Sequence, residues 1–150
     1  MFYRYFVRLI LFQFDSETVH NFIVRLCKVV WSFKLGRAIS KFIFQSNRSG
    51  RKPTKIGTLE VKNPIGLAAG FDKNAELLDG IETLGFGFVE IGTGTLKPQI
   101  GNPRPRLFRQ PERFALVNRM GFNNDGAVII SERLRQKKNR ISIPVGVNIG

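Results

Sequence analysis

The sequence predicts an α/β protein that has helices in its N-terminal part and a parallel sheet in the rest. Three observations lead to this fold class: residues 1–45 carry apolar side chains at helical spacing, residues 46–55 form a polar stretch with Gly and Pro, and a strand, loop, helix pattern recurs from residue 56 onward. Strands that alternate with helices are typical of parallel sheets, because a parallel pair needs a long connection. We therefore expect helices at 1–45, a linker at 46–55 and an α/β unit at 56–150.

The first segment is predicted to contain one long helix and a shorter one. Asp15 or Ser16 is a suitable N-cap, and Glu17 places a negative charge in the first turn. The apolar residues that follow have helical spacing: Val19, Phe22, Ile23, Leu26, Val29, Val30 and Phe33. Gly36 is expected to end this helix, and residues 38–44 are expected to form the shorter one.

The α/β unit is predicted from apolar runs that Gly, Pro and polar residues interrupt. The loop expected at 97–113 contains four prolines. The expected elements are a hairpin at 56–61, a buried strand at 64–70, a helix at 75–84 ended by Gly85, a strand at 86–92, the loop at 97–113, a helix at 126–138 and a strand at 143–149.

Charge and aromatic content single out the N-terminal part. Residues 1–52 hold ten Lys/Arg against two Asp/Glu, and eleven of the seventeen aromatic residues lie between Phe2 and Phe44. A basic segment that is also aromatic fits a lipid surface better than a nucleic acid. Charged residues interrupt every apolar run before it reaches the ~20 residues of a membrane span. We expect this part to lie on a membrane without crossing it.

Polar residues follow the predicted strands at the points where the strands end. Asp72 and Lys73 follow the first strand, Thr93 ends the second and Asn148 lies near the end of the third. The C-terminal ends of parallel strands in a barrel share one rim, where active sites lie. Four glycines would let a flat ligand approach the backbone there: Gly66, Gly70, Gly92 and Gly94.

Each of these residues also has a simpler interpretation. Lys73 could be an exposed residue at a helix start, although a cation there opposes the helix dipole. Thr93 could be an ordinary residue at a strand end. The amide of Asn148 could serve either a ligand or an internal hydrogen bond, since a buried amide needs partners. The basic run at 133–140 is better explained as a solvated helix end than as a nucleic-acid site.

Residues 118–124, Asn-Arg-Met-Gly-Phe-Asn-Asn, combine amide groups, a guanidinium and a glycine without a strand or helix period. This composition is typical of a loop that holds a small planar anion. Together with residues 66–74 and 90–95, this loop resembles the dihydroorotate dehydrogenases of the membrane-associated, quinone-using class. The resemblance extends from about residue 6 to residue 150.

The resemblance implies the N-terminal part of a (β/α)8 TIM barrel preceded by a small helical cap that associates with a membrane. It also implies oxidation of dihydroorotate to orotate in pyrimidine biosynthesis, with FMN as cofactor and a membrane quinone as electron acceptor. Such a protein is expected to be monomeric and peripheral on the cytoplasmic side of the cell membrane, without a nucleic-acid partner or a metal.

The family pattern assigns roles to particular positions of this chain. It implies contacts to FMN from Ala69, Gly70, Phe71, Asp72, Lys73, Thr93 and Asn148. It implies contacts to the substrate from Lys73, Asn118, Arg119, Met120, Gly121 and Phe122. It places His20 and Arg109 near the quinone, where a guanidinium beside a quinone carbonyl can stabilise developing negative charge.

Proteins of this family are roughly twice as long as this chain, as an α/β barrel requires. We therefore expect these 150 residues to be the N-terminal half of such a protein. The serine that acts as catalytic base in this class lies later than Gly150 in the family pattern, so no catalytic residue is assigned. Two alternatives remain: another FMN-dependent barrel oxidoreductase, or a non-catalytic basic segment that binds a membrane or RNA.

Overall fold

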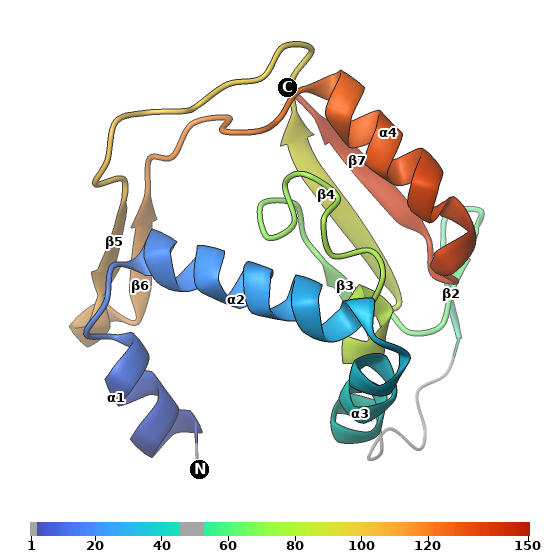
Figure 1. The fold of residues 1–150 in the computed structure, drawn as a ribbon, viewed down its shortest axis with the longest axis horizontal. Helices are drawn as coiled ribbons and strands as arrows, with labels where there is room; N and C mark the ends of the chain where they lie inside the picture. Colours follow the sequence, from blue (N-terminus) through green and yellow to red (C-terminus); the bar gives the residue numbers. More distant parts are fainter. Residues whose placement is uncertain (1–2, 46–52) are drawn as a thin grey trace.

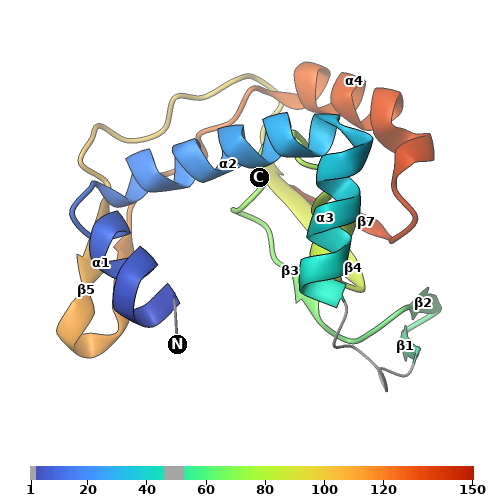
Figure 2. The same ribbon diagram turned by 60° about the horizontal axis from the view of Figure 1, so that its bottom comes forward.

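The structure of the protein, a computed structural model, describes residues 3–45 and 53–150. A three-stranded parallel sheet forms its centre, with the strand order β3 (Gly66–Leu67), β4 (Phe88–Gly94), β7 (Val145–Ile149). Helix α2 (Ser16–Ser32) runs from a hairpin at one end of the molecule to α3 (Lys34–Gln45) beside the sheet (Figures 1 and 2). The hairpin consists of β5 (Leu107–Gln110) and β6 (Ala115–Asn118), and helix α4 (Ala127–Lys137) lies along β7. The predicted α/β class is confirmed.

The described part of the N-terminal segment is helical, as predicted. A π-helical stretch η1 (Tyr3–Val7) continues into α1 (Arg8–Leu11), followed by α2 (Ser16–Ser32) and α3 (Lys34–Gln45). Asp15 is the N-cap of α2, since its carboxylate accepts a hydrogen bond from the Thr18 amide at 2.9 Å. Within the described residues, no helix is both long enough and apolar enough to cross a membrane.

The prediction that Gly36 ends the long helix is wrong. α2 ends at Ser32, and Phe33 has an extended backbone before α3 begins. Gly36 lies inside α3, where an added Cβ would stand 2.0 Å from the Val30 carbonyl oxygen. The glycine therefore serves the close approach of α2 and α3 rather than the end of a helix.

The predicted hairpin is confirmed, with β1 (Thr54–Ile56) antiparallel to β2 (Leu59–Val61). Residues 46–52 of the expected linker lie outside the described residues. Its last two residues, Thr54 and Lys55, belong to β1 and pair with Val61 and Glu60. Regular structure therefore begins at Thr54, within the segment that was expected to be a linker.

The three predicted sheet strands are present as β3 (Gly66–Leu67), β4 (Phe88–Gly94) and β7 (Val145–Ile149), all parallel. β3 is much shorter than the buried strand expected at 64–70, and its two residues are only half-buried. The strand alternation of β4 buries Val89 and Ile91. They belong to one core cluster: Trp31, Ala75, Leu77, Leu78, Ile81, Val89, Ile91, Ile130 and Ile143.

The helix predicted at 75–84 is mostly absent, and only the short 3-10 helix η2 (Ile81–Leu84) forms. Ala75 has a φ of 57°, which no helix accommodates. The Asp72 carboxylate accepts the amides of Glu76 and Leu77, both at 2.8 Å, and so forms a compact turn. The predicted end at Gly85 is confirmed, since it follows η2 with a left-handed backbone.

The segment expected to be a loop at 97–113 contains a strand that the sequence analysis missed. β5 (Leu107–Gln110) is followed by the 3-10 turn η3 (Pro111–Arg113) and pairs antiparallel with β6 (Ala115–Asn118). The turn places Phe114 at a φ of 50°, a conformation that normally calls for Gly or Asn. The usual sequence signal of a hairpin is therefore missing.

The last predicted helix is confirmed as α4 (Ala127–Lys137), which continues into the 3-10 turn η4 (Lys138–Arg140). Cations of the basic run at its end make ion pairs within the chain, because Arg133 contacts Asp125 at 2.6 Å and Lys137 contacts Asp79 at 3.0 Å. These two cations therefore hold the end of α4 against the chain, and the Lys137 side chain is only 14% exposed.

Helix α2 packs into the same core as the sheet through Trp31. Its indole ring is 3% exposed, and its Nε1 donates a hydrogen bond to Ser40 Oγ at 2.9 Å. An added Cβ on Gly80 would stand 2.1 Å from the Trp31 ring. The end of α2 is therefore anchored on the α/β unit, and this orients the first turns of α2 over the C-terminal side of β3 and β4.

Candidate functional site

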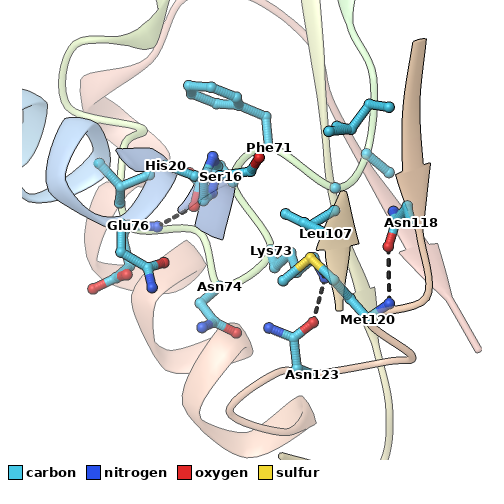
Figure 3. Close-up of a pocket in the computed structure, with 16 residues that line it drawn as sticks. Ser16, His20, Phe71, Lys73, Asn74, Glu76, Leu107, Asn118, Met120 and Asn123 are labelled. Atoms are coloured by element: carbon cyan, nitrogen blue, oxygen red, sulfur yellow. Dashed lines mark hydrogen bonds between the residues drawn. The ribbon is translucent and has the colours of Figure 1, made fainter. Parts of the chain in front are cut away.

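A cavity of about 440 Å³ lies between the first turns of α2, the segment after β3 and the β5–β6 hairpin (Figure 3). Its lining residues come from all three places: Ser16, His20, Asn21, Val24, Ala69, Gly70, Phe71, Asp72, Lys73, Asn74, Glu76, Leu107, Leu116, Asn118, Met120 and Asn123. The sites proposed for cofactor, substrate and quinone each contribute to this one cavity.

Lys73 is the cation of the cavity. Its side chain is half-buried, its Nζ donates a hydrogen bond to Asn123 Oδ1, and Met120 Sδ lies 4.0 Å away. Burial lowers the pKa of Lys73, and the nearby positive charge of Arg106 lowers it further. Among the described residues no carboxylate contacts this amine directly, and a bound anion would favour its charged form.

Asp72 has a different role from its neighbour. Its side chain is 2% exposed and accepts the two amides of the turn described above. Burial raises the pKa of this carboxyl, and the two hydrogen bonds partly oppose that change. The Asp72 side chain thus holds the turn that presents Lys73, while its backbone faces the cavity.

The glycines do not all have the role that was expected. An added Cβ at Gly66 would stand 2.1 Å from the Phe88 ring, and one at Gly92 would stand 2.5 Å from the Asn148 carbonyl oxygen. Gly94 meets Ile130 Cδ1 at 3.1 Å. Only Gly70, at a φ of 102°, would point a Cβ into open space within 4 Å. Among these four glycines, Gly70 alone leaves room for a ligand, and the other three serve packing of the chain.

The ends of the three strands meet through hydrogen bonds. Gly70 N donates to Gly92 O at 2.8 Å, and Thr93 Oγ1 contacts Asn148 Oδ1 at 2.5 Å. The rim predicted from the sequence therefore brings Thr93 and Asn148 together, but neither of them lines the cavity. The internal hydrogen bond considered for Asn148 is present, and the pair lies beside the glycine-rich end of β4.

The loop at 118–122 presents only part of its side chains to the cavity. Asn118 and Met120 line it, and the Asn118 side chain also accepts the Met120 amide at 2.9 Å. Arg119 instead lies over the Phe108 ring at 5.7 Å and donates to Pro105 O at 3.1 Å. Gly121 and Phe122 do not line the cavity either.

Asn123 is a lining residue that the residue assignments omitted. It directly contacts Lys73, and it belongs to the run at 118–124 that the sequence analysis had already singled out. Its neighbour Asn124 is buried and caps the turn into α4, since its Oδ1 accepts the Gly126 amide at 2.8 Å. The sequence could not show which of these two asparagines lines the cavity, because that depends on the tertiary structure.

The first turns of α2 close the cavity. His20 packs edge-on against Phe71, with ring centroids 5.1 Å apart. Burial lowers the pKa of His20, and the nearby positive charge of Lys73 lowers it further. A neutral imidazole is therefore favoured. Leu107 and Leu116 of the hairpin supply an apolar wall.

Arg109 lies outside this cavity. It pairs with Leu116 across the hairpin, so it shares a face with Leu107 and Asn118 but lies farther from the loop. Its guanidinium stands 4.7 Å from the centroid of the Phe12 ring and donates to Phe14 O at 2.5 Å. The structure therefore places His20 in the cavity lining and Arg109 outside it.

The sequence profile of the dihydroorotate dehydrogenase family matches residues 52–150. Two relatives named dihydroorotate dehydrogenase (quinone) are each 49% identical to the chain: the protein from Methylococcus capsulatus, which aligns with 100% of this chain and 42% of its own length, and that from Natronomonas pharaonis, with 93% and 39%. The chain therefore spans well under half the length of these relatives.

A solved structure agrees with the sequence relatives. The crystal structure of the dihydroorotate dehydrogenase of Eimeria tenella in complex with ferulenol superposes with a TM-score of 0.70 at 36% identity and covers 91% of this chain and 36% of that chain. The profile match covers most of the chain, and the sequence and structural similarities agree. The chain therefore belongs to the dihydroorotate dehydrogenase family.

Proposed function

We propose that this chain supplies the dihydroorotate site and part of the FMN site of a quinone-dependent dihydroorotate dehydrogenase in pyrimidine biosynthesis. The observation that carries the proposal is the cavity in which Lys73 faces Asn118 and Asn123 beside the open backbone of Gly70. An ammonium and amide side chains match a planar substrate that has a carboxylate and alternating donors and acceptors on its edges.

The residues present fit FMN. Gly70 leaves open space where a flat ring can approach the backbone, and the segment 69–73 lines the same cavity. In this proposal Ala69, Gly70, Phe71 and Lys73 contact the cofactor, and the Thr93–Asn148 pair donates or accepts hydrogen bonds at its edge. FMN, when bound, supplies the acceptor for the hydride of dihydroorotate and the donor of electrons to the quinone.

The residues of this chain then act by binding and by electrostatics. Asn118 and Asn123 orient the substrate ring, and Lys73 holds the substrate carboxylate. Its ammonium also stabilises negative charge that develops beside it during oxidation. The side chains of Leu107, Leu116 and Phe71 limit the access of water to this end of the cavity.

The proposal extends to the architecture and the location of the protein. The β3-β4-β7 sheet is the start of a (β/α)8 barrel, and the helices at 3–45 form a cap on a membrane. Large apolar side chains on these helices are well exposed: Tyr5, Phe6, Leu9, Ile10, Phe14, Phe22, Leu26, Val29, Phe33, Leu35, Ile39, Phe42, Ile43 and Phe44. Such a surface fits peripheral binding on the cytoplasmic side of the cell membrane.

The quinone site in this proposal lies between α1, α2 and the hairpin. His20 stands at its inner end, beside Phe71, and Arg109 at its outer end, beside Phe12. Leu107 and Leu116 line the cavity together with His20, and the hairpin register places them on the same face as Arg109. An apolar passage with a cation near its mouth suits a quinone, whose reduction places negative charge on a carbonyl oxygen.

The test uses a protein of the relatives' full length that contains these 150 residues, called the full-length enzyme below. It should purify with FMN, and dihydroorotate should bleach the flavin absorbance under anaerobic conditions. A soluble quinone should then restore that absorbance. A protein that binds FMN but is not bleached by dihydroorotate would show that the substrate assignment is wrong.

A further inference from the structure

A buried ion pair lies between α2 and the loop at 100–106, and neither of its residues lines the cavity. Glu17 is 3% exposed and Arg106 is 5% exposed. Arg106 Nε donates to Glu17 Oε2 at 2.9 Å, and Arg106 Nη2 donates to Glu17 Oε1 at 2.7 Å. In this bidentate geometry two parallel N–H donors of the planar guanidinium meet the two oxygens of the carboxylate, which fixes the relative orientation of the two side chains.

The third nitrogen of Arg106 holds the loop itself. Nη1 donates to Ile100 O at 2.7 Å and to Asn102 O at 2.8 Å. Gly101 lies between these carbonyls, and an added Cβ there would stand 2.8 Å from Arg106 Nη1 and 2.3 Å from Met120 O. All three nitrogens of one buried guanidinium thus donate hydrogen bonds, two of them to a helix and the third to a tight loop.

The loop in turn supports the residues that line the cavity. Asn102 N donates to Met120 O at 2.9 Å, and Asn102 Nδ2 donates to Arg119 O at 2.7 Å. Arg119 N donates to Arg106 O at 2.9 Å. Hydrogen bonds therefore hold the backbone of residues 119–120 against the loop that Arg106 orders. Asn118 and Met120, which line the cavity, belong to the same stretch of backbone.

The other partner, Glu17, belongs to the wall across the cavity. It lies in the first turn of α2 between two lining residues, Ser16 and His20. One ion pair therefore connects the two walls that enclose the cavity at Lys73. Arg104 also donates to Glu17, at 2.7 Å, but its side chain is 63% exposed and it makes no contact with the loop carbonyls.

We propose that Glu17 and Arg106 are positioning residues that fix the 118–120 segment against α2 and so set the affinity for dihydroorotate and orotate. The inference rests on the proposed function, because it takes residues 118–120 as part of the substrate site. Neither residue touches the substrate. The pair acts through the loop at 100–106, whose backbone carries Met120 and Arg119.

The main variant is Arg106→Lys in the full-length enzyme. Lysine keeps the charge beside Glu17, but its single ammonium lacks the planar fork and cannot serve the carboxylate and both carbonyls together. We expect the KM for dihydroorotate and the Kd of orotate to rise roughly tenfold. The kcat at saturating substrate, the FMN content and the rate of flavin reoxidation by quinone should stay within about twofold.

The matched control is Arg104→Lys, which changes the exposed partner of the same carboxylate. It should leave the orotate Kd within about twofold of the wild type. Amide hydrogen exchange gives a second readout, because Arg106→Lys should increase exchange at residues 118–124 and leave β4 and β7 unchanged. A general loss of stability would instead increase exchange in the strands and reduce the FMN content.

A double variant, Glu17→Met with Arg106→Met, keeps the proposal testable if a single variant folds poorly. Replacing both partners of a buried pair with apolar side chains is often neutral for stability. The double variant should retain FMN but keep the weakened orotate binding, since the loop carbonyls still lack their donor.

Three outcomes are decisive. A wild-type enzyme that binds no orotate overturns the proposed function and this inference with it. A wild-type enzyme that binds orotate, together with an Arg106→Lys variant of unchanged orotate affinity and loop exchange, overturns this inference alone. A folded double variant whose orotate affinity returns to that of the wild type does the same.

Discussion

At the scale of single residues, the cavity separates two kinds of contact to a bound substrate. Lys73 follows β3 and borders both the open backbone of Gly70 and the amide of Asn123. Asn118 ends β6 on the hairpin and borders Met120. In the proposed function Lys73 therefore contacts cofactor and substrate, whereas Asn118 contacts substrate alone.

The first prediction compares Lys73→Ala with Asn118→Ala in the full-length enzyme. Lys73→Ala should reduce turnover and change the visible spectrum of the flavin, because the cation beside the ring is lost. Asn118→Ala should keep full FMN occupancy and lose about 1.5–3 kcal/mol of substrate binding, or roughly ten- to hundredfold in kcat/KM. FMN stoichiometry and steady-state kinetics check both. An Asn118→Ala variant that loses its flavin, or that keeps wild-type kinetics, would remove residues 118–122 from the substrate site.

The second prediction concerns the quinone half of the reaction. Arg109 lies outside the cavity, beside Phe12 and Phe14, and His20 is one of the residues that line it. Arg109→Ala and His20→Ala should slow reoxidation of the flavin by quinone, for Arg109 by roughly tenfold or more since a charged donor is lost. Reduction of the flavin by dihydroorotate should be nearly unchanged. Stopped-flow absorbance measures the two half-reactions separately, and an equal decrease in both would contradict the quinone assignment.

The third prediction is the pH dependence of stability that Glu17 contributes. The hydrogen bonds from Arg106 hold the pKa of Glu17 below its ordinary value of 4.5, although burial opposes this. The folded state thus binds this proton less readily than the unfolded state does. The stabilisation is fully present above pH 4.5 and is lost as the pH falls through the lowered value, by at most about 1.4 kcal/mol per pH unit.

Thermal unfolding of the full-length enzyme between neutral and acidic pH checks this. The Tm of the Glu17→Met, Arg106→Met double variant should fall less steeply with acid than the Tm of the wild type. The variant has no carboxyl group at position 17 that could take up a proton on unfolding. Arg104→Lys serves as the control and should follow the wild type. Equal acid slopes for the wild type and the double variant would mean that Glu17 does not contribute in this pH range.

At the scale of elements, the N-terminal helices carry large apolar side chains both in the core and on the surface. Trp31 of α2 is buried against η2 and the sheet, whereas Phe42 of α3 is 76% exposed. Deleting residues 1–45 would therefore remove part of the core along with any membrane surface. Substitution of single exposed residues is the sharper way to test membrane binding.

The fourth prediction is that Phe42→Asp weakens binding of the full-length enzyme to vesicles of anionic phospholipid. If the Phe42 side chain inserts into the lipid, its loss removes about 1.5–3 kcal/mol of binding free energy, or roughly tenfold or more in the partition coefficient. Added salt should weaken the binding of the wild type as well, through the Lys and Arg component. Val128→Asp on α4, where the side chain is 75% exposed, is the matched control and should bind as the wild type. Equal loss for both variants would mean that α3 is not the membrane surface.

The elements also differ in how far local sequence predicts them. Helix α2 has a good N-cap and a continuous apolar period, and both were recognised from the residues. The segment at 75–80 has an apolar pattern as well, but the Asp72 carboxylate competes for its first amides and Ala75 adopts a positive φ. Periodicity cannot detect such competition, because it depends on a side chain outside the apolar pattern.

At the scale of the whole molecule, the sheet leaves its outer strands unpaired on one side. β3 and β7 are the two edges of the parallel sheet among the described residues, and Ile149 of β7 is 83% exposed. Unpaired edges and exposed apolar side chains favour association with other chains. Our fifth prediction is that these 150 residues, expressed alone, aggregate or need a partner segment. A soluble monomer with bound FMN and a cooperative melt, observed by sedimentation and calorimetry, would contradict it.

The amino-acid sequence by itself predicted the α/β class, the family, the helical N-terminal part and the three parallel strands. These follow from local patterns: apolar spacing, capping residues, and polar residues placed directly after strands. The same patterns indicated that residues 118–124 form a functional loop.

Only the tertiary structure decided which residues of these segments face one cavity. It turned Asn123 toward Lys73 and Arg119 away, and it paired β5 with β6 across a turn that has no glycine. It also joined Glu17 to Arg106, which lie 89 positions apart in the chain. Contacts of this kind depend on the packing of α2 against the α/β unit through Trp31. No local pattern encodes them, because each partner alone looks like an ordinary charged or polar residue.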